Sequence, residues 1–351
     1  MFQPQTWPSL IGALLERRDL SISDATWAME QVMLGEATPA QLAGFLVALR
    51  SKGETVDEIV GFRDAILEHA NPLEIDPNVL DIVGTGGDGF KTVNISTTAS
   101  IVAAATGIPV VKHGNKAASS ASGSSDVLGA LGIRLDLSGE SVARVLDEAG
   151  ITFVFAAAFH PGFRHAGVVR SELGVPTVFN FLGPLCNPAR PEASAVGVAR
   201  AEAIPLIVGV FQTRGASALV FRGDDGLDEL STTGHSHIWE VSNGAVTEHD
   251  LDPRELGIPR ARMSDLAGAD AATNAETVRR VLAGDGGPVR DIVLLNAAAG
   301  ISAWELAQNP ANADRPILER LSESYERAAS AIDSGAAQSK LSAWIAASNA
   351  A

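Results

Sequence analysis

The sequence predicts an α/β fold in which a small N-terminal helical domain precedes a larger α/β domain with a mainly parallel central sheet. Residues 1–75 carry helix start signals and apolar side chains at helical spacing. After them, short apolar runs alternate with helical segments. Asn71-Pro72 and Asp76-Pro77 are turn dipeptides at the change of pattern. We therefore expect a helical domain over residues 1–75 and an α/β domain over residues 76–351.

The helical domain is predicted from its capping residues. Thr38-Pro-Ala-Gln41 combines a cap, a proline at the first helical position and a glutamine that completes a capping box. Thr55-Val-Asp-Glu58 is a second capping box. Two earlier helices are expected, from Leu10 to Arg17 and from Ser23 to about Leu34. Because their apolar residues recur at helical spacing, we interpret these stripes as core.

The α/β domain is predicted from alternating strands and helices. A strand at Leu80–Val83 precedes a glycine-rich loop and a helix from about Ser96 to Ala105, and a strand at Ile108–Val111 precedes a helix at Ser124–Leu131. The later expected elements are a helix that ends at Val145–Gly150, a strand at Ile151–Ala156, a helix at His160–Leu173, the alternating segments Ala195–Val198, Ile204–Gln212 and Ala218–Phe221, a hairpin at Asn243-Gly244, a buried strand at Asp291–Leu295, and a mostly helical tail at Pro316–Ala347.

Composition and charge exclude several classes of protein. Hydrophobic residues make up 46% of the chain, which is ordinary for a globular protein. The formal net charge of -16 disfavours binding to nucleic acid and to anionic membranes. A single cysteine, Cys186, excludes an internal disulfide and a cysteine-built zinc site, and it suits a reducing cytoplasm. Neither a secretory signal nor a membrane span is expected.

The glycine-rich loop after the first strand is the strongest functional signal. Gly84, Gly86, Gly87 and Gly89 remove side chains where a polyanion could approach the backbone. The following segment, Asn94–Thr97, supplies hydroxyls and free N–H groups at a helix N-terminus. The loop therefore predicts a phosphate site, although a βα turn without any ligand has the same appearance.

A second loop, Lys112–Ser124, also lies between a predicted strand and a predicted helix, so it should reach the same edge of the sheet. Lys112 and Lys116 offer positive charge, and Asn115 can donate and accept. The serines of the loop can bind a ligand, but helix capping and solvation are the favoured explanation for them taken alone. For His113, a ring packed under the loop is favoured over a general base.

A third loop, Gly223–Thr233, carries adjacent carboxylates at Asp228 and Glu229. Such oxygen ligands suit Mg²⁺ that also contacts substrate phosphates. The pair Asp224-Asp225 is interpreted as a solvated acidic turn. The magnesium interpretation of Asp228 and Glu229 depends on the phosphate site, since a magnesium diphosphate needs both.

These motifs together resemble the anthranilate phosphoribosyltransferase family over nearly the whole chain. The resemblance rests on six motifs: Gly84-Thr-Gly-Gly-Asp88, Asn94-Ile-Ser-Thr97, Lys112-His-Gly-Asn115, Arg170-Ser-Glu-Leu-Gly174, Asn180-Phe-Leu-Gly-Pro184 and Asp228-Glu229. It implies the nucleoside phosphorylase-like fold, with the helical domain completed by a segment near residues 160–190. It also implies a homodimer that transfers the phosphoribosyl group of 5-phosphoribosyl 1-diphosphate (PRPP) to anthranilate, in tryptophan synthesis, with two Mg²⁺ per subunit.

The resemblance also implies roles for particular residues. Those for PRPP are Gly84, Gly87, Asp88, Thr92, Asn94, Ile95, Ser96, Thr97, Lys112, His113, Gly114, Asn115, Lys116, Ala117, Ala118, Ser119, Ser120 and Ser124. Those for anthranilate are Gly84, Asn115 and Arg170, and those for Mg²⁺ are Ser96, Asp228 and Glu229. His160, Pro161 and Phe163 resemble the lining of a channel for the aromatic ring. No acid or base residue is assigned, because an aromatic amine is already a neutral nucleophile and catalysis can proceed by positioning and electrostatics.

Two departures from the family pattern and two alternative functions stay open. Lys116 stands where many members have arginine, which would remove a planar bidentate contact, and Cys186 stands where threonine is usual. A pyrimidine nucleoside phosphorylase would share the fold and the glycine loop but would not need the pair Asp228-Glu229. A catalytically silent relative that binds nucleic acid would need a basic face, which the net charge of -16 disfavours.

Overall fold

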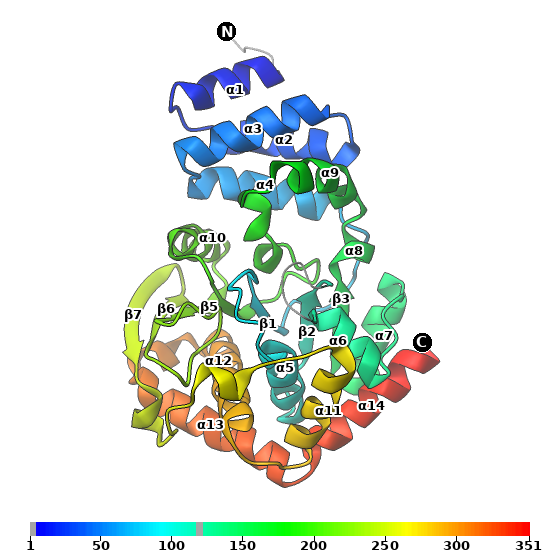
Figure 1. Ribbon diagram of the computed structural model, residues 1–351, viewed down its shortest axis with the longest axis vertical. Helices are drawn as coiled ribbons and strands as arrows, with labels where there is room; N and C mark the ends of the chain where they lie inside the picture. The colour runs from blue at the N-terminus through cyan, green and yellow to red at the C-terminus, as the bar shows by residue number, and fades with distance from the viewer. Residues whose placement is uncertain (1–4, 117–121) are drawn as a thin grey trace.

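The computed structural model describes residues 5–116 and 122–351. An N-terminal helical bundle lies at one end of the molecule, above a larger α/β body (Figure 1). Its first four helices are α1 (Trp7–Leu15), α2 (Ile22–Leu34), α3 (Pro39–Lys52) and α4 (Val56–Glu68). Thr38 and Gln41 form the expected capping box of α3, and Thr55 and Glu58 form that of α4. Local sequence signals therefore place α3 and α4 correctly, whereas α1 begins at Trp7 and ends at Leu15, before the expected bounds Leu10 and Arg17.

A seven-stranded sheet forms the centre of the α/β body, in the order β3-β2-β1-β4-β5-β6-β7. Strands β1 to β5 are parallel, whereas β6 and β7 are antiparallel to their neighbours and form the hairpin expected at Asn243-Gly244. The strand bounds are β1 (Leu80–Gly84), β2 (Val110–Gly114), β3 (Ile151–Phe155), β4 (Ala193–Gly197), β5 (Ser217–Gly223), β6 (Ser236–Ser242) and β7 (Ala245–Leu251).

Helices cover both faces of the sheet, so alternate side chains of the strands enter two different cores. Leu80 and Ile82 pack with α5 (Ile95–Ala105), α12 (Pro288–Gln308), α13 (Ile317–Asp333) and α14 (Ala336–Ala350). Val83 faces the other way, into a core shared with α10 (Ile204–Arg214) and the helical bundle. The other helices are α6 (Ser124–Leu131), α7 (Gly139–Ala149), α8 (Ala156–Phe159), α9 (Arg164–Leu173) and α11 (Ala271–Leu282). No helix among the described residues is long and apolar enough to cross a membrane.

Seven short 3-10 turns complete the described elements: Pro161–Phe163, Val178–Asn180, Gly183–Leu185, Ala201–Ala203, Pro253–Leu256, Met263–Leu266 and Pro310–Asp314.

One predicted strand is wrong: residues Asp291–Leu295 belong to the helix α12. This helix is buried between the sheet and α13, and its apolar residues extend around it. A helix that is buried on all sides has no amphipathic stripe, so a short apolar run within it cannot be distinguished from a buried strand. The predicted helix His160–Leu173 also begins later, at Arg164, after the 3-10 turn Pro161–Phe163, and His160 lies between α8 and that turn.

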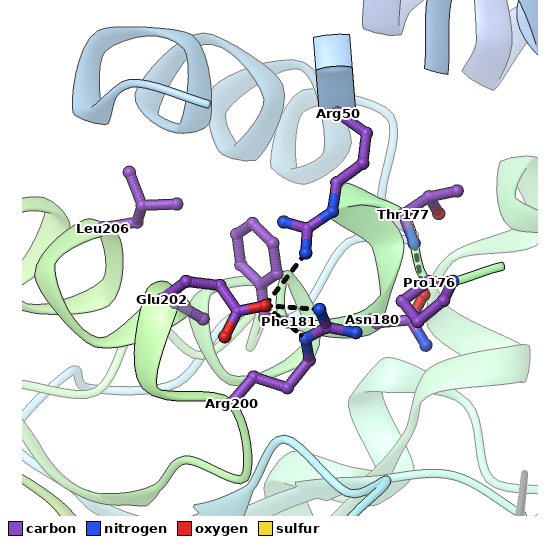
Figure 2. Close-up of a pocket in the computed structure, with 9 residues that line it drawn as sticks. Arg50, Pro176, Thr177, Asn180, Phe181, Arg200, Glu202 and Leu206 are labelled. Atoms are coloured by element: carbon purple, nitrogen blue, oxygen red, sulfur yellow. Dashed lines mark hydrogen bonds and ion pairs between the residues drawn. The ribbon is translucent and has the colours of Figure 1, made fainter. Parts of the chain in front are cut away.

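The helical bundle also contains α9, which packs on α2 and α3, and it meets the α/β body where α4 packs on α10. Nearby, Arg50 of α3 donates to the carboxylate of Glu202 at 2.9 Å, and Arg200 binds the same carboxylate (Figure 2). These side chains are partly exposed, so the ion pairs contribute little to stability. The pocket beside them has a free volume of about 10 Å³, which is room for one water molecule and not for a substrate.

Candidate active site

The strand order places the candidate site at the centre of the sheet. Parallel strands progress in one direction from β1 through β2 to β3, and in the other direction from β4 to β5. Ligands of open α/β sheets bind at this change of direction, beyond the carboxyl ends of the strands. Gly84 and Gly197 end β1 and β4 and are partners in the register. The loops predicted to carry chemistry follow β1, β2 and β5, so they reach this edge.

Asp228 fills the space that these two glycines leave open. A Cβ atom on Gly197 would lie 1.6 Å from the carbonyl oxygen of Asp228, and one on Gly84 would lie 2.3 Å from its Oδ2. The backbone N–H of Gly86 donates to the same Oδ2 at 2.6 Å. Burial, together with the nearby carboxylate of Asp88, raises the pKa of Asp228 to about 7. The acidic loop and the glycine loop are thus joined at the centre of the sheet.

The glycine loop has the open backbone that a phosphate site needs. Gly86, Gly87 and Gly89 have φ angles of 69°, 84° and 80°, in the left-handed region that favours glycine. All three residues are exposed. The loop leads into α5, whose N-terminus carries the partial positive charge of the helix dipole. This backbone can therefore approach an anion without steric obstruction.

Glu229, Ser96 and Lys112 connect the acidic pair to the start of α5. Loss of solvation and the adjacent Asp228 raise the pKa of Glu229 well above its usual value. A hydrogen bond from the backbone of Ser96 acts in the opposite direction and lowers this pKa. Lys112 is buried, and its Nζ donates to the carbonyl of Ile82 at 2.6 Å and to Oγ of Ser96 at 3.3 Å. Burial lowers the pKa of Lys112. Its charge therefore lies beneath the site and not on the exposed loop.

The donor set fits a divalent cation that is completed by a ligand. Across residues 5–116 and 122–351, no three His, Cys, Asp or Glu side chains come together in a way that could hold a metal ion. The carboxylates of Asp228 and Glu229 and the hydroxyl of Ser96 are oxygen donors, which Mg²⁺ prefers. Mg²⁺ usually binds through one or two carboxylates plus substrate phosphates, so this incomplete set agrees with a magnesium site that forms with a phosphorylated substrate.

The second loop is anchored by groups below it. Nδ1 of His113 lies 3.0 Å from the carbonyl oxygen of Gly183, as expected for a ring packed under the loop. The side chain of Asn115 accepts from the backbone N–H of Lys116 at 2.8 Å, and Oγ of Ser124 donates to the carbonyl of Asn115 at 3.2 Å. The predicted serine cap of α6 is wrong, because its N-cap residue is Gly123. Four predicted PRPP residues, Ala117, Ala118, Ser119 and Ser120, lie outside the described residues.

A line of ring contacts begins at His113 and ends at Phe179. Ring centroids are 5.4 Å apart for His113 and His160, 5.2 Å for His160 and Phe163, and 5.9 Å for Phe163 and Phe179. The guanidinium of Arg170 lies over Phe179, 5.2 Å from the ring centroid. Burial lowers the pKa of Arg170, and among the described residues it forms no salt bridge. Its guanidinium is therefore available for the carboxylate of a ligand.

The buried histidines predict that acid destabilises the fold. Burial lowers the pKa of His160 to about 4, and burial and His160 lower that of His113 to about 3, from 6.5. Below pH 6.5 the unfolded chain binds a proton at each histidine while the folded chain does not, so stability decreases on acidification by up to about 1.4 kcal/mol per pH unit for each.

Urea denaturation of the wild type and of His160→Gln at pH 7 and 5 measures this contribution, because titrations common to both proteins cancel. The stability advantage of the wild type should shrink by about 2 kcal/mol at the lower pH. A difference that stays constant between the two pH values would show that His160 is protonated equally in the folded and unfolded chains.

Several residues of the site were not predicted. Asp81 is buried in β1, where Oδ1 accepts from the backbone N–H of His113 at 3.1 Å and Oδ2 accepts from Nδ2 of Asn187 at 2.9 Å. Burial raises its pKa to about 6. The carboxyl group within an apolar strand was a detectable signal for Asp81. Phe179 and Asn296, whose side chain bonds to the backbone of Leu230, gave no such signal in the sequence. An aromatic ring and a lone amide both have ordinary structural explanations.

The fold and the site together define a class: a helical bundle joined to an α/β domain that has an open glycine loop and an acidic pair at the switch point of its sheet. Comparison with known families agrees. Residues 8–70 match the helical bundle domain of a glycosyl transferase family, and residues 76–338 match its a/b domain. Within this class, the chain belongs to the anthranilate phosphoribosyltransferase family.

The relatives that show the family match nearly the whole chain. The anthranilate phosphoribosyltransferase of Leifsonia xyli subsp. xyli is 70% identical over 347 residues, which are 99% of each chain. The crystal structure of the enzyme from Thermus thermophilus has a TM-score of 0.88 at 40% identity and covers 97% of this chain and 99% of its own. A Saccharomyces cerevisiae anthranilate phosphoribosyltransferase in complex with PRPP and Mg has a TM-score of 0.87 at 29% identity and covers 99% of both chains.

Proposed function

We propose that this chain transfers the 5-phosphoribosyl group of PRPP to the amine of anthranilate, which gives N-(5-phosphoribosyl)anthranilate and diphosphate in tryptophan biosynthesis. The observation that supports this best is the place of Asp228 and Glu229. They lie at the switch point of the sheet, joined to the glycine loop through the N–H of Gly86. A pyrimidine nucleoside phosphorylase needs a phosphate loop but no such acidic pair, so this arrangement favours the diphosphate donor.

The glycine loop and the start of α5 would hold the donor phosphates. The exposed backbone of Gly86, Gly87 and Gly89 can donate N–H groups, and the positive end of α5 favours the same anion. Thr92 and the segment Asn94–Thr97 follow directly, and the second loop begins at Lys112 on the neighbouring strand β2. The two loops would enclose the donor from two sides.

The acidic pair would hold the metal. Ser96, Asp228 and Glu229 are the residues that we assign to two Mg²⁺ ions per subunit, with substrate oxygens as further ligands. When bound, Mg²⁺ would neutralise charge on the departing diphosphate. Without a cation, the raised pKa values of Asp228 and Glu229 mean that the site is unfavourable for two negative charges. We likewise propose the domain boundary at residue 75 and the roles of the predicted site residues.

The acceptor side would align the amine and leave it unprotonated. Arg170 would bind the carboxylate of anthranilate by charge-assisted hydrogen bonds, and Gly84 and Asn115 would border the same molecule. His113 and His160 have lowered pKa values, so both rings are neutral near pH 7 and add no charge beside the aromatic ring. Because the amine is neutral and nucleophilic, no residue is assigned to remove a proton before attack, and the work of the site is alignment.

The Arg170→Ala variant should raise the KM for anthranilate by roughly 10-fold or more, because one charge-assisted contact is lost. The KM for PRPP should change much less, since the phosphate loops lie on the sheet and Arg170 lies on α9. Steady-state kinetics with each substrate varied in turn measures both values. Arg164→Ala, on the same helix but exposed, is the matched control. Equal increases in the two KM values would contradict the role of Arg170.

One assay tests the proposed function itself: the loss of anthranilate fluorescence with PRPP, first with Mg²⁺ and then with EDTA. Loss that requires both PRPP and Mg²⁺ supports the proposal, and its absence would overturn it. Phosphorolysis of thymidine or uridine, measured in parallel, tests the pyrimidine nucleoside phosphorylase. A gel shift with DNA or RNA at low salt tests the nucleic-acid-binding alternative.

We also propose that the protein is a cytoplasmic homodimer that associates through the helical bundle. Of the exposed large apolar residues, six lie on or beside bundle helices: Leu15, Ile22, Leu34, Val47, Val168 and Val175. The free thiol of Cys186 suits a reducing compartment. Light scattering of the purified protein should give the mass of two chains, and a Val47→Glu substitution should shift it toward one. A monomeric wild type, or recovery of the protein outside the cytoplasmic fraction, would contradict the proposal.

A further inference from the structure

The segment Met263–Asn274, which no motif singled out, lies directly against the glycine loop. Its backbone is paired with the loop by two hydrogen bonds. The N–H of Val93 donates to the carbonyl oxygen of Leu266 at 3.0 Å, and the N–H of Gly268 donates to the carbonyl oxygen of Lys91 at 2.8 Å. A Cβ atom on Gly268 would lie 2.4 Å from the carbonyl oxygen of Thr92. This close backbone contact makes the segment a support for the part of the loop that enters α5.

At the end of this segment, Asn274 begins a chain of three hydrogen bonds. Its side chain is 2% exposed. Its Oδ1 accepts from the backbone N–H of Ala269 at 2.8 Å, and its Nδ2 donates to Oδ1 of Asn94 at 2.9 Å. Nδ2 of Asn94 in turn donates to the backbone carbonyl of Ser122 at 3.1 Å. The chain therefore joins α11, the end of the glycine loop and the start of α6.

The direction of these bonds is fixed by their ends. The N–H of Ala269 can only donate, so the amide oxygen of Asn274 must face it and its NH₂ must face Asn94. The carbonyl of Ser122 can only accept, so the NH₂ of Asn94 must face it and the amide oxygen of Asn94 must face Asn274. Asn94 is the N-cap residue of α5, yet its side chain makes no cap hydrogen bond. Its carboxamide is instead occupied between two other elements.

We propose that Asn274 is a positioning residue for the donor site. It holds the Asn94 carboxamide in one orientation and thereby fixes the spacing between the loops that follow β1 and β2. This inference rests on the proposed function, in which both loops bind PRPP. It also changes the role assigned to Asn94. The Asn94 side chain holds the two loops together, and the donor is contacted by the backbone of Asn94 and by the neighbouring residues.

The first test is a double-mutant cycle with Asn94→Ala, Asn274→Ala and the double variant. If the two side chains act through one another, each single variant should raise the KM for PRPP roughly 10-fold, and the double variant should raise it little further. The KM for anthranilate should change less than the KM for PRPP, because Arg170, which is assigned to its carboxylate, lies on α9. If the increase in the KM for PRPP in the double variant equals the product of the two single increases, the proposal is wrong.

A conservative variant separates positioning from a general loss of stability. Asn274→Asp keeps the oxygen that accepts from Ala269, and the introduced carboxyl can donate to Asn94 only when protonated. Its KM for PRPP, divided by the wild-type value at the same pH, should therefore be smaller near pH 6 than near pH 8, roughly by a factor of three or more. For Asn274→Ala the corresponding ratio should not depend on pH. Equal pH dependence of the two variants would count against the Asn94 link.

Ser302→Ala is the matched control for the loss of a buried hydrogen bond. Ser302 of α12 bonds to Ser324 of α13 at 2.9 Å, in the core between these two helices. This variant should lower the melting temperature as Asn274→Ala does, but should leave the KM for PRPP unchanged. A raised KM for PRPP in Ser302→Ala would show that instability alone explains the effect.

Direct binding of PRPP to the full-length variants, measured by calorimetry with Mg²⁺, keeps this inference separate from the proposed function. If the wild type binds PRPP but does not consume anthranilate, the proposed acceptor fails and the Asn274 effect on binding can still be measured. If the wild type is active and Asn274→Ala binds PRPP as tightly as the wild type does, the inference fails and the function stands.

Discussion

The Asp228→Asn variant should lower kcat/KM for PRPP by roughly 10²- to 10³-fold, the magnitude typical of removing one charged or donor group from a transition-state site. Asp228 is held by close backbone contacts: Gly84 and Gly197 leave room for it, and the N–H of Gly86 donates to it. The amide would keep the shape but lose the charge that attracts Mg²⁺. Kinetics at several Mg²⁺ concentrations should show a raised metal requirement as well as slower turnover.

Glu229→Gln should change the kinetics in the same direction, and Asp224→Asn is the matched control from the same loop. Asp224 is exposed, and within the described part of the chain its carboxylate pairs with His237 of β6 at 3.6 Å. Its replacement should leave the magnesium dependence as in the wild type. If Asp228→Asn and Glu229→Gln both behave like this control, the metal assignment is wrong.

The Gly197→Ala variant should lose both stability and activity. An added Cβ would lie 1.6 Å from the backbone oxygen of Asp228 and 2.3 Å from its carbonyl carbon, so the backbone itself must move. Overpacking of this kind costs about 1–3 kcal/mol and sometimes more. The movement displaces Asp228 from the glycine loop, so kcat should fall even where the protein remains folded. Urea denaturation and steady-state kinetics on the same preparation measure the two effects.

Gly12→Ala is the matched control for Gly197→Ala. Gly12 lies within α1, and a Cβ added there would meet no atom within 4 Å. Alanine favours a helix over glycine by about 1 kcal/mol, so this variant should be at least as stable as the wild type and fully active. If Gly197→Ala resembles Gly12→Ala in both measurements, the close contact between β4 and Asp228 is not required.

The parts of the fold that depend on local signals could be predicted from the sequence. The capping boxes at Thr38 and Thr55 act within a few residues, and both appear as expected. The hairpin at Asn243-Gly244 is local in the same sense. The strand expected at Asp291–Leu295 failed because burial on every side of α12 removes the periodicity on which the prediction depends.

The site shows the same division between local and distant information. The rule that loops after parallel strands meet at one edge predicted that the glycine loop and the loop after β2 share one side of the sheet. The acidic pair was connected to them only through its need for a phosphate partner and through the family resemblance. Asn274 could not be found in this way, because its partner Asn94 is 180 residues away in the sequence and both are ordinary polar residues. Asn296, which donates to and accepts from the backbone of Leu230 at 2.9 Å, was missed for the same reason.

The separation of Arg170 from the acidic pair has a consequence for redesign. Arg170 and the rings of Phe163 and Phe179 lie on α9 and on segments that pack with the helical bundle. Gly84 and Asn115, which are also assigned to anthranilate, lie at or just after the ends of β1 and β2, where the residues assigned to the diphosphate lie as well. New aromatic acceptors are therefore best selected by varying Phe163 and Phe179, because these two positions are not assigned to the sugar donor. The acceptor end of the site can be redesigned from the side of the helical bundle.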